Sequence, residues 1–205
     1  MKAFSIKVLS LSCILCISLS CFAEPGDDLI KSGHQKIESG DFKGAVTDFT
    51  KAVSVNPKAA DAYFGRGVAN DDMQNYKEAI ADYSSAIKIN ASYVNAYLNR
   101  GVSKTNLEQY KEAVADFDKA IELDPKNEDA YYNRALAKGF SGDRKSVMED
   151  YNKVIELNNK SGRAYLNRGI LFLASGDKTR ACDDLKKATG LGLKIAEELV
   201  KKNCE

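Results

Sequence analysis

The sequence predicts an all-α protein, a solenoid of five helix-turn-helix units, because three sets of residues recur every 34 positions. The first set pairs a tyrosine with an arginine one helical turn later: Tyr63/Arg66, Tyr97/Arg100, Tyr131/Arg134 and Tyr165/Arg168. The second pairs an aspartate with a large apolar residue: Asp48/Phe49, Asp82/Tyr83, Asp116/Phe117, Asp150/Tyr151 and Asp184/Leu185. The third consists of small residues: Gly33, Gly67, Gly101, Ala135 and Gly169. Together they define units at 26–59, 60–93, 94–127, 128–161 and 162–195 within one domain, 24–205.

Each unit contains two stretches with helical spacing of apolar residues, separated by turn signals. In the third unit, for example, residues 111–123 form an amphipathic stripe with charged residues opposite. Gly-Asp pairs mark the turns inside three units: Gly40-Asp41, Gly142-Asp143 and Gly176-Asp177. Asn56-Pro57 and Asp124-Pro125 mark the ends of units one and three. We therefore expect two antiparallel helices per unit.

The pattern running from Ala96-Tyr97-Leu98-Asn99-Arg100-Gly101 through Ala113, Phe117, Ala120 and Pro125 resembles the tetratricopeptide repeat (TPR) family. The resemblance implies a right-handed α-solenoid in which small residues let helices approach and an aromatic residue wedges between successive pairs. Unit four replaces its small residues with Ala135, Val147 and Val154. We expect wider helix spacing or a change in curvature there.

Residues 1–23 have the layout of a secretory signal peptide, with Lys2 and Lys7 before an apolar stretch at 8–19, followed by Cys21-Phe22-Ala23. We expect cleavage between Ala23 and Glu24, and export to the periplasm or the medium of a bacterium. The apolar stretch is too short to remain as a membrane anchor. An alternative is a lipoprotein anchored in the outer membrane through Cys21, although the position of Leu19 departs from the usual pattern.

Cleavage would leave 28 basic and 29 acidic residues, a formal net charge of −1. This balance gives no electrostatic reason to expect nucleic acid or anionic lipid as a partner. One histidine, no tryptophan, no phosphate-binding glycine loop and no cluster at metal-ligand spacing argue against an enzyme. We therefore expect no catalytic residues, no metal and no cofactor, and interpret His34 as a surface residue that faces a partner.

The charged residues of the repeats favour a structural role. One constant separation joins each aspartate to the arginine of the following unit, in Asp48/Arg66, Asp82/Arg100, Asp116/Arg134 and Asp150/Arg168. We expect ion pairs between neighbouring repeats, because pairing inside each repeat would leave Asp48 facing Ser32, which cannot neutralise it. Loss of one partner from a dry pair would cost roughly 3 to 5 kcal/mol.

The chain ends in a predicted capping helix at about 194–203, which would cover the last repeat. Cys182 and Cys204 lie at equal distances from the turn near Leu193, so an antiparallel hairpin would bring them together. In an exported protein we expect them to form a disulfide, and the alternative is two free thiols.

The predicted concave surface carries an apolar stripe and a row of amides. The fifth and ninth positions of repeats two to five hold Phe64, Val68, Leu98, Val102, Tyr132, Leu136, Leu166 and Ile170, and the sixth positions of the last three hold Asn99, Asn133 and Asn167. Asparagine amides can both donate to and accept from a peptide backbone. We expect an adaptor that binds a segment of another protein here. A homodimer that buries the same stripe is the alternative, and the stripe could instead serve only internal packing.

Overall fold

The computed structural model describes residues 26–204, except for the side chains of residues 144 and 145, and within this range the chain is all α-helical. The N-terminal segment with the predicted cleavage site at Ala23 and Glu24 lies outside the described residues. The helices are α1 (Asp27–Glu38), α2 (Phe42–Val55), α3 (Ala60–Asp72), α4 (Tyr76–Ile89), α5 (Val94–Asn106), α6 (Tyr110–Leu123), α7 (Glu128–Ser141), α8 (Arg144–Leu157), α9 (Gly162–Ala174), α10 (Lys178–Gly190) and α11 (Lys194–Asn203). The predicted all-α repeat fold is confirmed.

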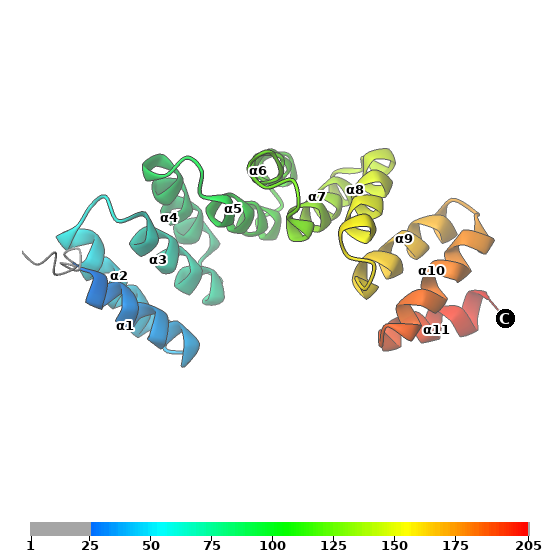
Figure 1. The fold of residues 1–205 in the computed structure, drawn as a ribbon, viewed down its shortest axis with the longest axis horizontal. Helices are drawn as coiled ribbons and strands as arrows, with labels where there is room; N and C mark the ends of the chain where they lie inside the picture. The colour runs from blue at the N-terminus through cyan, green and yellow to red at the C-terminus, as the bar shows by residue number, and fades with distance from the viewer. Residues whose placement is uncertain (1–25, 205) are drawn as a thin grey trace, which may run out of the picture.

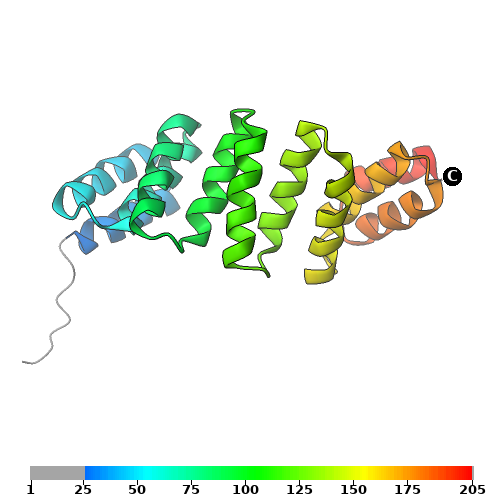
Figure 2. The same ribbon diagram turned by 90° about the horizontal axis from the view of Figure 1, so that it is seen from above.

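The helix pairs follow one another in a curved array, so that the molecule has the shape of an arch (Figure 1). The first helices of the repeats, α1, α3, α5, α7 and α9, line the inner side, and the second helices lie on the outer side (Figure 1). Figure 2 shows the array from above, with α4 to α8 side by side. None of the described helices is both long and apolar enough to cross a membrane.

The turn inside each repeat contains one residue with a left-handed backbone at the same position of the repeat. Glycine takes this conformation at Gly40, Gly142 and Gly176, and Gln74 and Glu108 adopt it in repeats two and three with φ of 62° and 61°. After each of these three glycines, an aspartate caps the second helix by accepting a backbone N–H, at Asp41, Asp143 and Asp177. The left-handed conformation therefore belongs to this position of the repeat, and the residue there need not be glycine.

The turn between repeats is closed by a side chain rather than by proline. Its first residue accepts a hydrogen bond from the second backbone N–H after it, at 3.0–3.1 Å, in each of four turns: Asn56, Asn90, Asp124 and Asn158. This short side-chain turn explains why repeats two and four keep the register without the proline of repeats one and three.

The core consists of the large apolar residue of each second helix set against small residues of the first helices. Phe49, Tyr83, Phe117 and Leu185 are fully buried, and Tyr151 is 3% exposed. A Cβ atom added to Gly101 would lie 2.6 Å from the Phe117 ring, and one added to Gly67 would lie 2.7 Å from Tyr83. Phe117 also packs against Ala137 of the following repeat. The aromatic ring thus fixes the spacing within a repeat and to the next one.

Repeat four departs from this pattern at its boundary with repeat five. The packing between α8 and α9 is sparser than at the other junctions between repeats, whereas α7 and α8 pack as closely as other pairs. Val147 and Val154 are buried in place of smaller residues. The larger side chains therefore act on the junction that follows the repeat, not on the helix pair inside it.

The last helix, α11, packs against α10 at the end of the array. Cys182 on α10 and Cys204 after α11 have Cα atoms 5.7 Å apart, and the structure joins their sulfur atoms. This separation lies within the range that a disulfide requires. The bond would tie the final helix to the last repeat.

We predict that Gly101→Ala lowers the free energy of unfolding by about 1–3 kcal/mol, because the new Cβ would overlap a buried ring that cannot withdraw. The control is Gly139→Ala on α7, where an added Cβ would have a single neighbour, Val147 at 4.0 Å. This control should gain about 0.5–1 kcal/mol from helix propensity. Urea unfolding of both variants measures the difference in the free energy of unfolding. Equal effects would contradict the close contact between Phe117 and Gly101.

We also predict that the mature protein carries no free thiol at Cys182 or Cys204. Iodoacetamide in denaturant without reductant should leave its mass unchanged, whereas prior reduction should add two adducts. Reduction should lower stability by about 3 kcal/mol, the loop-closure contribution of a loop of this length. Two adducts without reductant would show free thiols.

Candidate functional site

The predicted apolar stripe lies on the first helices along the inner side of the arch (Figure 1). Its eight members are all accessible to some degree: Phe64, Val68, Leu98, Val102, Tyr132, Leu136 and Leu166 are half-buried, and Ile170 is exposed. Leu98 and Val102 also pack against the cluster around Phe117, and Tyr132 packs against the cluster around Tyr151. Much of the stripe therefore serves the core as well as the surface.

An apolar part of this surface lies between α7, α8 and α9. A pocket of about 250 Å³ opens there, bounded by Leu136 and Gly139 of α7, Val147 and Tyr151 of α8, and Ile170 of α9. Phe140 lies at this pocket and is 64% exposed. The structure thus brings together three residues that the sequence predicted for the groove, Leu136, Asn167 and Ile170.

The repeat pattern did not predict Phe140 at this surface, because the predicted stripe and row of amides consist of the fifth, sixth and ninth positions of the repeat. Phe140 occupies the thirteenth position, where the other repeats have a polar or small residue. Its ring stacks on Tyr110 with centroids 5.3 Å apart. The available signal was a single aromatic residue at a position where the other repeats have a polar or small residue.

The three asparagines of the predicted amide row have different surroundings. Asn167 donates to the hydroxyls of Tyr132 and Tyr151 at 3.1 and 3.2 Å. Asn133 donates to the backbone carbonyl of Asp129 in its own helix, at 2.8 Å. The wedge residue of the preceding repeat is a tyrosine for Asn99 and Asn167, whereas for Asn133 it is Phe117, which has no hydroxyl. The wedge residue of one repeat therefore decides what the amide of the next repeat can contact.

Burial raises the pKa of the Tyr151 hydroxyl to about 12. The hydroxyl therefore stays protonated at neutral pH and retains both a proton to donate and lone pairs to accept. Next to it, Arg163 stacks over the Tyr132 ring at 4.2 Å and pairs with Asp129. This corner of the groove is polar, and its charges are neutralised within the protein.

The charged residues of the repeats form ion pairs inside each repeat, so the predicted pairing between neighbours is wrong. Each arginine donates twice to the aspartate on the second helix of its own repeat at 2.5–3.0 Å, in the pairs Arg66/Asp82, Arg100/Asp116, Arg134/Asp150 and Arg168/Asp184. The two helices of one repeat are antiparallel neighbours, which places these positions side by side. The predicted register would have joined positions that do not face each other.

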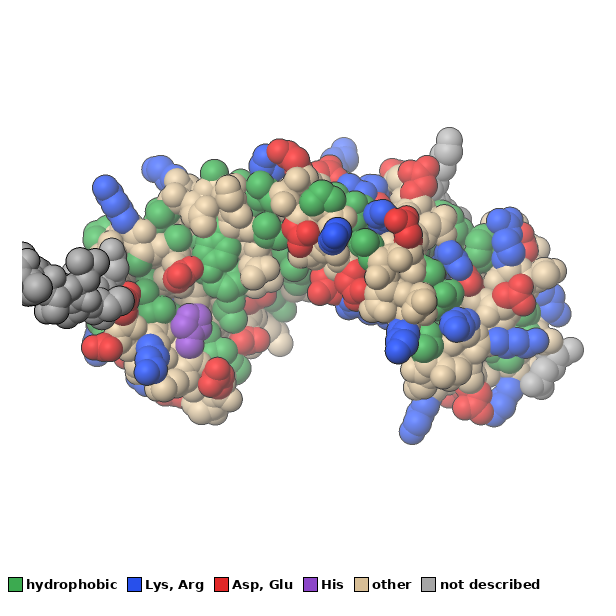
Figure 3. Space-filling model, viewed as in Figure 1, with side chains coloured by type: hydrophobic (Ala, Val, Ile, Leu, Met, Phe, Trp, Pro, Cys, Tyr) green, Lys and Arg blue, Asp and Glu red, His purple; other side chains and the backbone are tan. Residues whose placement is uncertain are grey.

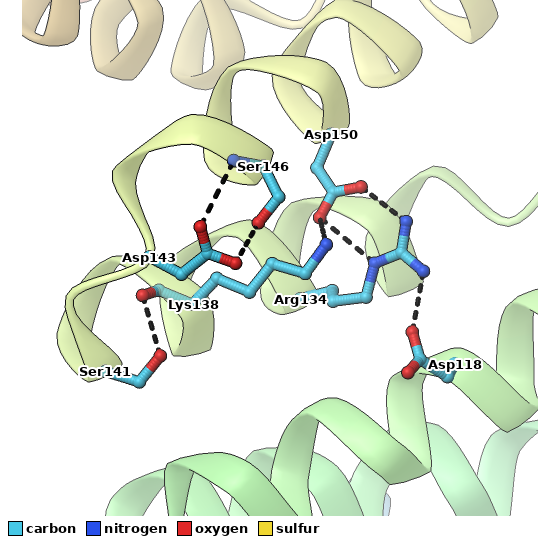
Figure 4. A network of polar contacts seen from close by, with 7 residues as sticks. All are labelled: Asp118, Arg134, Lys138, Ser141, Asp143, Ser146 and Asp150. Carbon is cyan, nitrogen blue, oxygen red and sulfur yellow. Dashed lines mark hydrogen bonds and ion pairs between the residues drawn. The ribbon is translucent and has the colours of Figure 1, made fainter.

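The same arginines also reach the preceding repeat through their remaining nitrogen. This Nη1 atom donates at 2.7–3.2 Å to Thr50, Ser84, Asp118 and Asn152, respectively. Figure 4 shows Arg134 between Asp150 of its own repeat and Asp118 of the one before. The arginines therefore do connect neighbouring repeats, but through a residue that the prediction did not consider.

Asp48 shows why pairing inside a repeat is possible where no arginine is present. It accepts from Ser32 at 2.7 Å and from Lys36 at 2.6 Å. These hydrogen bonds, chiefly the one from Lys36, hold the pKa of Asp48 below its usual value. The prediction failed because it treated Ser32 as the sole partner and overlooked the lysine one helical turn later.

No group of three or more potential metal ligands is present in the part of the chain that the structure describes. Acidic and basic side chains are mixed over the side of the molecule shown in Figure 3, rather than gathered by sign. The most distinctive feature of the inner surface is therefore its apolar pocket with a polar corner.

Models of the tetratricopeptide repeat match residues 31–94, 94–127 and 117–143 of this chain. Together these matches span more than half of the sequence. The chain belongs to the tetratricopeptide repeat family.

Solved TPR structures superpose on most of the chain. MamA is 25% identical, with a TM-score of 0.75, and the match covers 80% of this chain and 96% of MamA. YrrB, described as a TPR protein with an unusual peptide-binding site, is 21% identical with a TM-score of 0.73, covering 87% and 93%. PilF from Pseudomonas aeruginosa is 20% identical with a TM-score of 0.75, covering 82% and 77%. A search of curated proteins finds no match. The comparisons establish the TPR fold.

The corrected ion pairs of the TPR array lead to a prediction about two arginines. Among the described residues, Asp82 has one cationic partner, Arg66, together with the Asn70 amide, whereas Asp116 has both Arg100 and Lys104. Arg66→Leu leaves a buried carboxylate without a cation and should cost about 3 kcal/mol, whereas Arg100→Leu should cost about 1 kcal/mol. Both arginines stack on a tyrosine in the same way, so packing losses are matched. Equal losses in urea unfolding would refute this assignment.

Proposed function

We propose that this TPR protein is a non-catalytic adaptor that binds a segment of a partner protein on its concave surface. The observation that carries the proposal is the apolar pocket between α7, α8 and α9, with Phe140 64% exposed and Ile170 42% exposed beside it. An exposed aromatic side chain at the edge of an apolar pocket is a common feature of surfaces that bind other proteins.

Hydrogen-bonding groups beside the pocket support a peptide as the ligand. The amide of Asn167 already donates to two tyrosine hydroxyls through its nitrogen. Its carbonyl oxygen accepts no hydrogen bond from the described residues, so it is available to a backbone N–H of a bound segment. We assign recognition of the main chain to Asn167 rather than to a uniform row of three asparagines.

The aromatic residues near the other end of the groove would extend this surface. Phe64 stacks on Tyr93 with centroids 4.9 Å apart, and the Tyr93 hydroxyl donates to Asp61 at 2.8 Å. Both rings are half-buried, so their edges remain open to a ligand. A long segment could lie across several first helices rather than in one pocket.

The adaptor is further proposed to act after export, because the N-terminal sequence has basic residues, then an apolar stretch, then an alanine at the predicted cleavage site. Anchoring through Cys21 and self-association through the groove are the alternatives. A homodimer would bury the same exposed residues, Phe140 and Ile170, so the two functions predict different occupants of one surface.

Photo-crosslinking in the organism that makes the protein separates these functions. Phe140 or Ile170 is replaced by p-benzoyl-phenylalanine on the concave side, and Ala81 or Ala115, both exposed on second helices, serves as the control. We expect a discrete heterologous adduct from the concave positions and none from the controls. An adduct with the mass of a dimer would assign the groove to self-association, and equal labelling from all four positions would refute a concave binding site.

A further inference from the structure

The exposed edge of the concave surface changes in chemistry from one end of the array to the other. The thirteenth positions of the five repeats lie at or next to the C-terminal ends of the first helices and are all exposed: Glu38, Asp72, Asn106, Phe140 and Ala174. This position is acidic in repeats one and two, polar in repeat three, and apolar in repeats four and five. A ligand that follows the groove would therefore meet two different environments.

At the acidic end, two carboxylates have no cationic partner among the described residues. Asp71 accepts a hydrogen bond from Ser103 at 2.7 Å, and neither Asp71 nor Asp72 forms an ion pair with any side chain that the structure describes. Burial, together with repulsion from Asp72, raises the pKa of Asp71. The lysines of the adjacent repeats, Lys36 in repeat one and Lys104 in repeat three, are bound to Asp48 and Asp116. A cation from outside would relieve this repulsion.

The pocket at the apolar end is of a size to hold one side chain. The volume of this pocket, about 250 Å³, lies below the range typical of small-molecule sites, and aliphatic and aromatic groups form most of its wall. The charged residues of this region, Lys138 and Arg163, are paired with Asp150 and Asp129. A single leucine or aromatic residue of a partner fits this chemistry.

We propose that the partner segment carries a large apolar side chain, which enters the α7–α9 pocket, and basic side chains, which pair with Asp71 and Asp72. This inference rests on the proposed function and specifies its ligand. The two ends are separated by two repeats, or roughly 20 Å for helices packed at ordinary distances. An extended segment spans this distance in about six residues, so the basic residues lie about six positions from the apolar anchor.

The test is a random peptide library displayed against the whole protein, followed by fluorescence anisotropy on the best peptide. Selected peptides should combine a leucine or aromatic residue with lysine or arginine about six positions away. Gly139→Leu fills the pocket, and its control, Gly190→Leu, places the same side chain where an added Cβ meets no atom within 4 Å. The pocket variant should weaken binding about tenfold, as expected for a displaced anchor residue, and the control should not.

The acidic end is tested separately by the double variant Asp71→Asn, Asp72→Asn, which keeps the acceptor for Ser103. The control variant, Glu78→Gln, Glu112→Gln, removes the same amount of negative charge from exposed positions of second helices. The first variant should weaken binding about tenfold at low salt and less at high salt, and the second should leave it unchanged. Circular dichroism verifies that all variants remain folded.

The outcomes distinguish a failure of the inference about the chemistry of the bound segment from a failure of the proposed function. If the selected peptides lose binding in Gly139→Leu but carry no basic residues, or do not respond to Asp71→Asn, Asp72→Asn, the inference is overturned. Peptide binding in the groove would still stand. Failure to enrich any peptide would overturn peptide binding itself. A dimer in light scattering that is lost in Gly139→Leu would assign the pocket to a second copy of the chain, and would overturn both.

Discussion

The contact on which the rest of this molecule depends is steric: a large buried apolar side chain on each second helix, aromatic in the first four repeats, packs against glycine or alanine on the first helix. Phe117 meets Gly101 and also Ala137 of the next repeat, so one contact sets two spacings. The curvature of the arch, the alignment of the first helices and the width of the groove all follow from these spacings. Where valines replace smaller residues in repeat four, the junction with repeat five loosens, and the apolar pocket opens beside it.

The repeat period was sufficient to predict the helix pairs, the turn signals and the fold class, because each depends on local spacing. The positions of the stripe residues on the first helices followed from the same period. The ion pairs were placed in the wrong register, because sequence separation alone does not say whether an aspartate faces the arginine before it or after it. The antiparallel geometry of the helix pair decides that the aspartate faces the first helix of its own repeat. In repeat one, where the arginine is missing, Lys36 forms the ion pair instead.

The candidate binding surface was harder to predict than the fold, because it arises from departures from the repeat rather than from the repeat itself. Phe140 stands at a position that carries no pattern in the other units, and the pocket beside it depends on the packing of three helices. The asparagines share a position but not an environment, since the neighbouring ring has a hydroxyl in Tyr151 and none in Phe117. A consensus description of the repeat therefore conceals the differences that give the groove its chemistry.

The groups that accept hydrogen bonds from the arginine Nη1 atoms differ in charge from one repeat to the next. Three of these four contacts reach a neutral group, of Thr50, Ser84 or Asn152, and one reaches the carboxylate of Asp118. Because Asp118 is more than half exposed, dissolved ions compete for this contact more than for the other three. Added salt therefore weakens the side-chain contact across the boundary of repeats three and four more than it weakens the corresponding contacts at the other three boundaries.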